Sequence, residues 1–238
     1  MTEASPNSRS AIVTGGGRGV GLAAVKVLSE RGWSVIALAR DVRAARAALA
    51  GHPSVDVRYA DLRDPASLVA VADTLPEDGI DLVVANAAQF APWDETTLTA
   101  DLDGVRDILE VNVIGTWRTV QAFSHALIRS QGSLIIVGSG GGSHGDPDFG
   151  IATNPGAVSY AASKAAVHAL GRKAALELGE KDVAVYVVDP GLTATAPGMA
   201  EMGARDPRSG ALSILRPVLG EGFVPAGSFS RDGRPLDW

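Results

Sequence analysis

The sequence contains no cysteine. This absence excludes a disulfide framework, a thiolate nucleophile and a cysteine-ligated zinc or iron–sulfur site. The four histidines, His52, His125, His144 and His168, stand far apart in the chain and form no HxxxH-type pair. No metal site is therefore predicted.

Long runs of one residue type are also missing. No apolar run reaches the roughly 20 residues that span a bilayer, and residues 1–10 lack the basic and apolar regions of a signal peptide. The formal net charge is -6, and no run of Lys or Arg occurs. We therefore expect a cytoplasmic protein with no nucleic-acid partner and no membrane partner.

What is present is the composition of an ordinary globular protein. Of 238 residues, 46% are hydrophobic and 20% are charged, which is enough apolar material for a sizeable core. No internal repeat and no linker divides the chain. We predict one domain over residues 1–238.

Predicted strands and helices alternate along the chain. Apolar segments predict strands at 11–14, 34–39, 55–59, 82–85, 133–137 and 183–188, and the continuous rather than alternating apolar character of 34–39 is that of a strand buried in a parallel sheet. Helical periodicity predicts helices at 20–28, 42–50, 65–75, 102–128 and 159–179. We expect an α/β fold with a doubly wound parallel sheet and helices on both faces, the Rossmann fold.

The remaining segments read less regularly. A loop rich in Gly, Ser, Asp and Pro occupies 138–155, and a final short strand is expected near 228–230. Scattered Gly and Pro from about 193 to 225 surround one short apolar stretch. We expect a mobile, lid-like substrate segment there.

A glycine cluster, Thr14 to Gly21, follows the first strand and opens the first helix. In such a turn Gly15 supplies the sharp bend, Gly19 lets the backbone approach a phosphate, and Gly21 lets the helix pack closely. The helix N-terminus then faces the negative charge. The position favours a dinucleotide site over an ordinary glycine-rich turn without ligand.

The choice of coenzyme depends on the end of the second strand. An acidic residue there favours the free 2'-hydroxyl of NAD, whereas arginine favours the 2'-phosphate of NADP. Ala39 stands where the acidic residue is expected, Arg40 follows it, and Arg18 lies inside the glycine turn. We therefore predict NADP(H), with NAD(H) as the alternative because Asp41 could reach the ribose after a shift of one residue.

Several motifs in order make the sequence resemble the short-chain dehydrogenase/reductase family over nearly the whole chain. They are the TGxxxGxG turn at Thr14 to Gly21, Asp61-Leu62, Asn86-Ala87-Ala88, Asn112, Ser139, the YxxxK pair Tyr160 and Lys164, and Pro190-Gly191 with Thr195. Two departures are Ala85 and Ala88, where the family often has Asn and Gly. We expect these alanines to change how the backbone packs against the coenzyme without removing the site.

Tyr160 and Lys164 are one helical turn apart, so both side chains can point into one cleft. A neighbouring ammonium and an oxidised nicotinamide would lower the phenol's pKa from about 10 and make Tyr160 a usable acid or base. The resemblance implies that Ser139 bonds the substrate oxygen and that Asn112 holds a water beside Lys164. Ser143 is an alternative to Ser139.

The resemblance also implies a set of coenzyme contacts. They are expected from Gly15, Gly17, Arg18, Gly19, Val20, Gly21, Arg40, Asp61, Leu62, Asn86, Ala87, Tyr160, Lys164, Pro190, Gly191, Thr193 and Thr195.

The expected activity is hydride transfer between a nicotinamide and a carbonyl or alcohol carbon of a small, largely apolar substrate. The long loop at 140–155 either shapes substrate choice or is only a solvated loop. A non-redox enzyme of the same fold, for dehydration or epimerisation, and a non-catalytic NADP sensor are the alternatives. By resemblance, a homodimer or homotetramer is expected.

Overall fold

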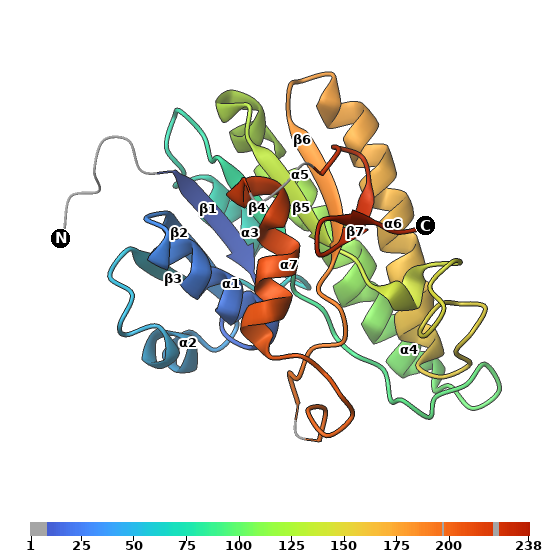
Figure 1. The fold of residues 1–238 in the computed structure, drawn as a ribbon. Coiled ribbons are helices and arrows are strands. Elements are labelled where there is room, and N and C mark those ends of the chain that lie inside the picture. The colour runs from blue at the N-terminus through green and yellow to red at the C-terminus, as the bar shows by residue number, and fades with distance from the viewer. Residues whose placement is uncertain (1–8, 197, 221–223) are drawn as a thin grey trace.

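The computed structural model describes residues 9–196, 198–220 and 224–238. Its strands form a single sheet in the order β3-β2-β1-β4-β5-β6-β7-β8. All neighbours pair in parallel except β7 and β8. The strands are β1 (Ser10–Thr14), β2 (Ser34–Ala39), β3 (Val55–Tyr59), β4 (Leu82–Ala85), β5 (Ser133–Val137), β6 (Ala184–Asp189), β7 (Phe229–Arg231) and β8 (Arg234–Pro235) (Figure 1).

The central strands are apolar on both faces, because both faces are covered. Along β1, Val13 belongs to one buried cluster and its neighbour Ile12 to another. Ile135 and Ile136 of β5 divide in the same way. Successive side chains of a strand point to opposite faces, so a continuous apolar run supplies two cores at once.

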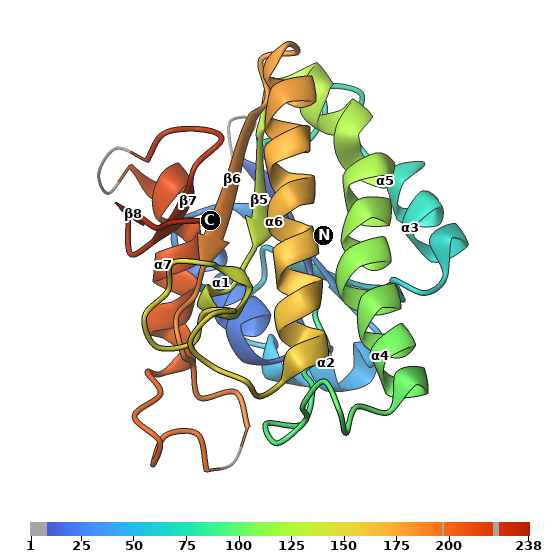
Figure 2. The same cartoon turned by 90° about the vertical axis from the view of Figure 1, so that its right-hand side faces the viewer.

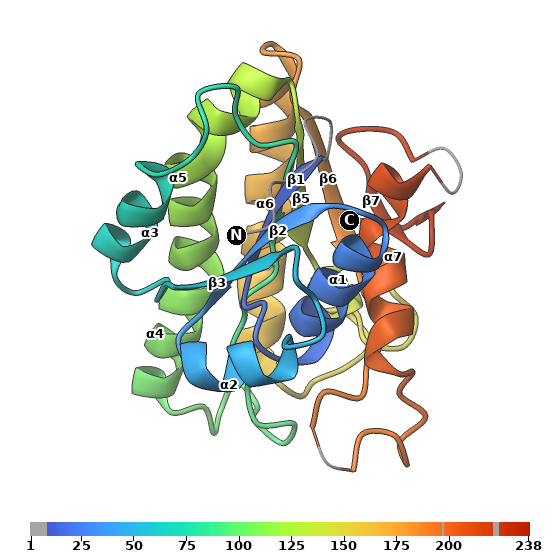
Figure 3. The ribbon, with the colours of Figure 1, turned by 90° about the vertical axis from the view of Figure 1, so that its left-hand side faces the viewer.

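Helices supply the other half of each core. On one face lie α1 (Gly19–Glu30), α2 (Val42–Ala48) and α7 (Pro207–Leu219). On the other lie α3 (Pro65–Ala72), α5 (Gly115–Ser130) and α6 (Val158–Gly179). Figures 2 and 3 show these layers on opposite sides of the sheet, with α4 (Leu102–Leu109) beside α6. The predicted doubly wound α/β fold is confirmed. No helix among the described residues is long and apolar enough to cross a membrane.

The helix predicted over 102–128 is interrupted. A π-helical turn, Glu110–Ile114, separates α4 from α5. The extra residue in such a turn shifts the direction of side chains, and π-turns often occur at functional sites. Here the turn carries Asn112, which is 1% exposed.

The segment predicted to be irregular contains α7. Asp206 caps this helix by accepting hydrogen bonds from the backbone N–H groups of Arg208 and Ser209, and Pro207 occupies its first turn. Buried Ala211, Ile214 and Leu215 join the same core as α1. The prolines at 207 and 217 concealed a helix that tertiary packing stabilises. The mobility expected for the rest of 193–225 stays a prediction.

Candidate active site

The glycine turn is tightly packed against the end of β4. Gly15 and Gly19 have φ of +66° and +55°, a region that favours glycine. A Cβ atom on Gly15 would lie 3.0 Å from the Ala87 Cα, and one on Gly21 would lie 2.3 Å from the Gly15 carbonyl oxygen. Larger residues would therefore push apart β1, β4 and α1.

The N-terminus of α1 provides what a pyrophosphate needs. Its first backbone N–H groups have no partner within the helix, and they carry the positive end of the helix dipole. Thr195 closes over the turn, because a Cβ atom on Gly19 would lie 3.1 Å from the Thr195 methyl carbon. The residues of this cradle fit a dinucleotide.

Arg18 and Arg40 leave the sheet at the same edge. A Cβ atom on Gly17 would lie 3.1 Å from the Ala39 Cβ, so the residues that follow each of these also lie near one another. Both arginines are exposed, and neither side chain has a hydrogen-bond or ion-pair partner within the described ranges. The Asp41 carboxylate is engaged as the cap of α2, accepting from the Ala44 N–H at 2.9 Å.

Other predicted coenzyme residues follow β3 and β4. Asp61 accepts a backbone hydrogen bond from Arg63 at 3.0 Å, and Leu62 is buried. The Asn86 side chain donates to the Thr14 carbonyl at 3.0 Å, and its backbone N–H donates to the Thr14 hydroxyl. Asn86 therefore joins the ends of β1 and β4, while Arg40, Asp61 and Leu62 lie outside the cavity described next.

A cavity of about 120 Å³ opens at the carboxyl edge of the sheet. It brings together residues from two sets that the sequence predicted separately, the coenzyme contacts and the catalytic residues. Its walls include the expected coenzyme residues Val20, Pro190, Gly191, Thr193 and Thr195 and the expected catalytic residues Ser139 and Tyr160. Lys164 and Asn112 do not line it.

Tyr160 and Lys164 are close, as their spacing predicted. The Lys164 Nζ lies 5.6 Å from the centre of the Tyr160 ring and donates to the Val137 carbonyl at 2.7 Å. Burial lowers the pKa of Lys164 to about 8, against the opposing effect of the Asp189 carboxylate. Burial also raises the pKa of Tyr160, a hydrogen bond from Ser139 lowers it, and Asp189 raises it further. The protein groups alone thus leave Tyr160 a neutral phenol.

Ser139 is held by its neighbours on both sides. Its backbone N–H donates to the His168 Nε2 at 3.2 Å, and its hydroxyl oxygen accepts from the Gly141 N–H at 3.1 Å. Burial and, to a smaller extent, the Lys164 charge lower the pKa of His168 to about 3, so the ring is a neutral acceptor. Ser143, the alternative to Ser139, donates to the Asp237 carbonyl and lies outside the cavity.

Asn112 connects three segments. Its side chain accepts from the Gln89 N–H at 2.7 Å and donates to the Gln89 carbonyl and to the Ser163 hydroxyl, both at 2.9 Å. It lies beside the segment after β4 and beside α6, but no direct bond joins it to Lys164. Its expected role in holding a water stays a prediction.

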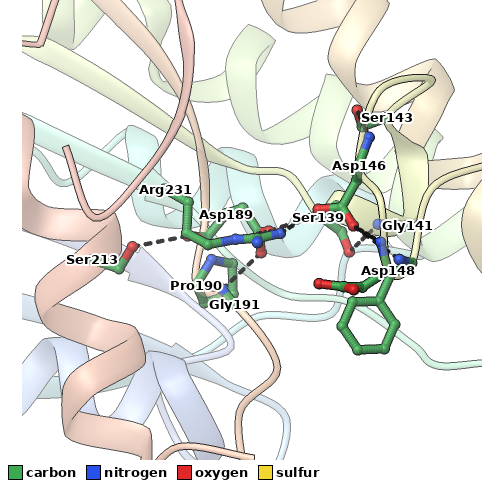
Figure 4. A network of polar contacts seen from close by, with 12 residues as sticks. Ser139, Gly141, Ser143, Asp146, Asp148, Asp189, Pro190, Gly191, Ser213 and Arg231 are labelled. Carbon is green, nitrogen blue, oxygen red and sulfur yellow. Dashed lines mark hydrogen bonds and ion pairs between the residues drawn. The ribbon is translucent and has the colours of Figure 1, made fainter. Parts of the chain in front are cut away.

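A buried network of ion pairs lies at the cavity (Figure 4). The sequence did not predict it. Arg231 of β7 donates to Asp189 at 2.5 and 2.8 Å and to Asp146 at 2.6 Å. Asp189 also accepts from the Gly140 N–H at 2.9 Å and the Gly191 N–H at 2.8 Å. The network thus fixes the residue after Ser139 and the start of the coenzyme segment. The position of Asp189 at a strand end was a usable signal, whereas nothing in the sequence marked Arg231.

Aromatic side chains form the other wall of the cavity. Phe90, Trp93 and Phe149 line it together with Tyr160. The loop that carries Phe149 was noted in the sequence as a possible substrate segment, but Phe90 and Trp93 were overlooked. The signal available was their place shortly after Asn86, just beyond a strand end.

Comparison with known proteins gives a consistent result. The family model for short chain dehydrogenases matches residues 9–205. L-fucose dehydrogenase of Bos taurus is 32% identical over 184 residues, which are 76% of this chain and 64% of that protein. This chain therefore matches less than two thirds of that relative's length.

Two further matches agree. Galactitol 2-dehydrogenase of Rhizobium johnstonii is 32% identical over 188 residues, covering 76% of this chain and 70% of that protein. A short chain dehydrogenase from Burkholderia cenocepacia, solved in complex with NADP, superposes with a TM-score of 0.76 at 27% identity and covers 91% of this chain and 86% of that one. This chain belongs to the short-chain dehydrogenase/reductase family, nicotinamide-dependent oxidoreductases that act on CH–OH or C=O groups.

Proposed function

We propose that this chain is an NADP(H)-dependent carbonyl reductase or alcohol dehydrogenase with Tyr160 as its general acid and base. One observation carries the proposal. Ser139 and Tyr160 line the same cavity as Val20 and Pro190, two of the expected coenzyme contacts. A proton donor and part of the expected coenzyme site thus share one space.

Each residue has a distinct task in this proposal. In reduction, the Tyr160 hydroxyl donates its proton to the carbonyl oxygen as negative charge develops there, and the Ser139 hydroxyl donates a hydrogen bond to the same oxygen. Lys164, whose pKa is about 8, is still mainly an ammonium at neutral pH and stabilises the phenolate left behind. Oxidation reverses these steps. When bound, the coenzyme supplies or accepts the hydride.

The preference for NADP(H) rests on charge at the ribose end. The exposed guanidinium groups of Arg18 and Arg40 would neutralise a 2'-phosphate, and Asp41 is engaged as a helix cap. The Burkholderia cenocepacia relative bound to NADP supports the same choice. NAD(H) is the alternative.

The substrate is proposed to be small and largely apolar. The charged lining residues Asp189 and Arg231 are paired with one another, so the cavity offers no free charge to a ligand. A non-redox step on the same site, or a sensor without turnover, is less consistent with a serine and a tyrosine facing one cavity.

Turnover tests the proposal directly. We expect steady loss of NADPH absorbance with a simple ketone and formation of the alcohol. Replacing Tyr160 by Phe removes only the hydroxyl, so kcat should fall by about 100-fold or more while the Kd for NADPH changes little. Tyr59→Phe, at an exposed position on β3, is the matched control and should behave as wild type.

Two results would contradict the proposal. Product formation without net change in NADPH would indicate a non-redox reaction. Full activity of Tyr160→Phe would show that Tyr160 is not the general acid and base.

A homodimer or homotetramer is also proposed from the family resemblance, and light scattering would measure its mass.

A further inference from the structure

Aromatic residues are concentrated at the cavity. The whole chain has five Phe, four Trp and three Tyr residues, and four of these twelve line this one space. They come from three separate segments: Phe90 and Trp93 after β4, Phe149 in the long loop, and Tyr160 at the start of α6. Tertiary folding therefore collects them at the reaction centre.

Two of the rings are held in position yet remain open to a ligand. Phe90 stacks on Tyr160 with ring centroids 4.1 Å apart and an interplanar angle of 15°. Trp93 lies 5.7 Å from Phe90, tilted by 44°. Phe90 and Trp93 are nevertheless 48% and 44% exposed. Exposed aromatic faces gathered in a cleft are a feature of ligand sites, because burial of the rings by a ligand is favourable.

The ion network holds the backbone that carries the third ring. The Phe149 N–H donates to the Asp146 carboxylate at 2.8 Å, and Arg231 holds that carboxylate from the other side. The backbone of Phe149 is therefore fixed at the cavity before a ligand binds, which lowers the ordering cost of binding.

Polar groups on this wall are few. Ser139 and Tyr160 supply the hydroxyls for the reacting oxygen. Asp189 and Arg231 are paired, and the Asn154 side chain oxygen accepts from the Gly156 N–H at 2.8 Å. The hydroxyls of Thr193 and Thr195, which also line the cavity, donate to the Gly191 carbonyl at 2.9 Å and to the Met199 sulfur at 3.8 Å. A polyhydroxylated substrate would leave most of its hydroxyls facing carbon, at a cost for each unpaired group.

We propose that the wall formed by Phe90, Trp93 and Phe149 selects ketones that carry an aromatic ring on or next to the carbonyl carbon, together with the corresponding secondary alcohols. The inference rests on the proposed function and adds the substrate class. It separates this chain from the relatives named for L-fucose and galactitol.

A matched pair of ketones tests the inference. Acetophenone and cyclohexyl methyl ketone have the same carbon count and differ in the aromaticity of the ring. We would measure kcat/KM for both with NADPH in wild type, Phe90→Leu and Trp93→Leu. Comparing the acetophenone/cyclohexyl ratio between proteins cancels the intrinsic reactivity of each ketone and any general effect of Phe90 on Tyr160.

We expect this ratio to fall by about 2- to 12-fold in each variant, the range that corresponds to one aromatic contact. Trp117→Leu is the matched control, since Trp117 lies on α5, is 50% exposed and does not line the cavity. Its ratio should equal that of wild type. Unchanged ratios in both cavity variants would overturn the inference, as would faster oxidation of L-fucose or galactitol than of 1-phenylethanol.

Calorimetry separates failure of this inference from failure of the proposed function. With NADP+ bound, no ketone can be reduced, so binding is measured without turnover. Tighter binding of acetophenone than of its cyclohexyl analogue, lost in Trp93→Leu, would support the aromatic site even if no ketone were reduced. Equal binding of the two ketones would reject it.

Discussion

Buried polar side chains at the reaction centre each have a defined partner. Lys164 is 4% exposed and donates to a strand carbonyl, and Asp189 is 3% exposed and accepts from Arg231 and two backbone N–H groups. His168 is 3% exposed and its Nε2 accepts from Ser139, whereas its Nδ1 has no hydrogen-bond partner among the described residues. A buried polar group that lacks a partner is costly, so these bonds also fix the geometry of the site.

At the ribose end, single residues should decide the coenzyme. Arg40→Ala should raise the KM for NADPH by about 10- to 100-fold, the loss expected for a charge-assisted hydrogen bond, and change the KM for NADH less than about twofold. Arg43→Ala, in the first turn of α2 and exposed, is the control. Parallel steady-state assays with both coenzymes measure this, and equal losses for both would exclude a phosphate contact by Arg40.

At the scale of elements, Arg231 ties strand β7 to the loop at 140–155 and to β6. The side chains of Asp146 and Asp189 are 1% and 4% exposed, and that of Arg231 is 26% exposed. Burial opposes the ionisation of Asp146, but the Phe149 N–H and Arg231 outweigh it and hold its pKa below the ordinary value. One guanidinium thus pairs with two buried carboxylates.

Removing that guanidinium should destabilise the protein. Arg231→Met leaves two buried carboxylates without their cation, and we expect a loss of about 2 to 4 kcal/mol in the free energy of unfolding. Adding Asp146→Asn should recover part of the loss, because it removes one unpaired charge. Arg234→Met on β8, an exposed position, should change little. Urea titrations measure the free energy of unfolding of all three variants. If Arg231→Met had the same free energy of unfolding as wild type, the network would contribute no stability.

At the scale of the whole molecule, we expect protonation of His168 to make the free energy of unfolding depend on pH. Its pKa is about 3 in the folded protein and about 6.5 when unfolded, so between these values the unfolded chain binds one more proton. Stability from this residue is therefore present above about pH 6.5 and is lost as the pH falls toward 3, at up to about 1.4 kcal/mol per unit.

His168→Gln should flatten this dependence while keeping an acceptor for the Ser139 N–H. The free energy of unfolding from urea curves at pH 7, 6, 5 and 4 would show it. His125→Gln, exposed on α5, should retain the wild-type slope. Identical slopes in His168→Gln and wild type would mean that His168 is not the group responsible.

The sequence determined the layered fold and much of the site, because these depend on local patterns. Apolar segments, continuous in all but β3, marked six of the strands, and the spacing of glycines after β1 marked the expected coenzyme turn. Tyr160 and Lys164 could be paired because a helix places residues four apart on one face. The helix α7 was not predicted, because its prolines disfavour a helix locally and its stability comes from packing against α1.

Only the tertiary structure decided which distant residues meet. Arg231, Asp189 and Asp146 are brought together from β7, β6 and a loop, and no periodicity records such a contact. Phe90 and Phe149 likewise join Tyr160 at one cavity from separate segments. The physical reason is that local backbone preferences fix elements, whereas charge pairing and aromatic contact depend on how those elements are assembled in space.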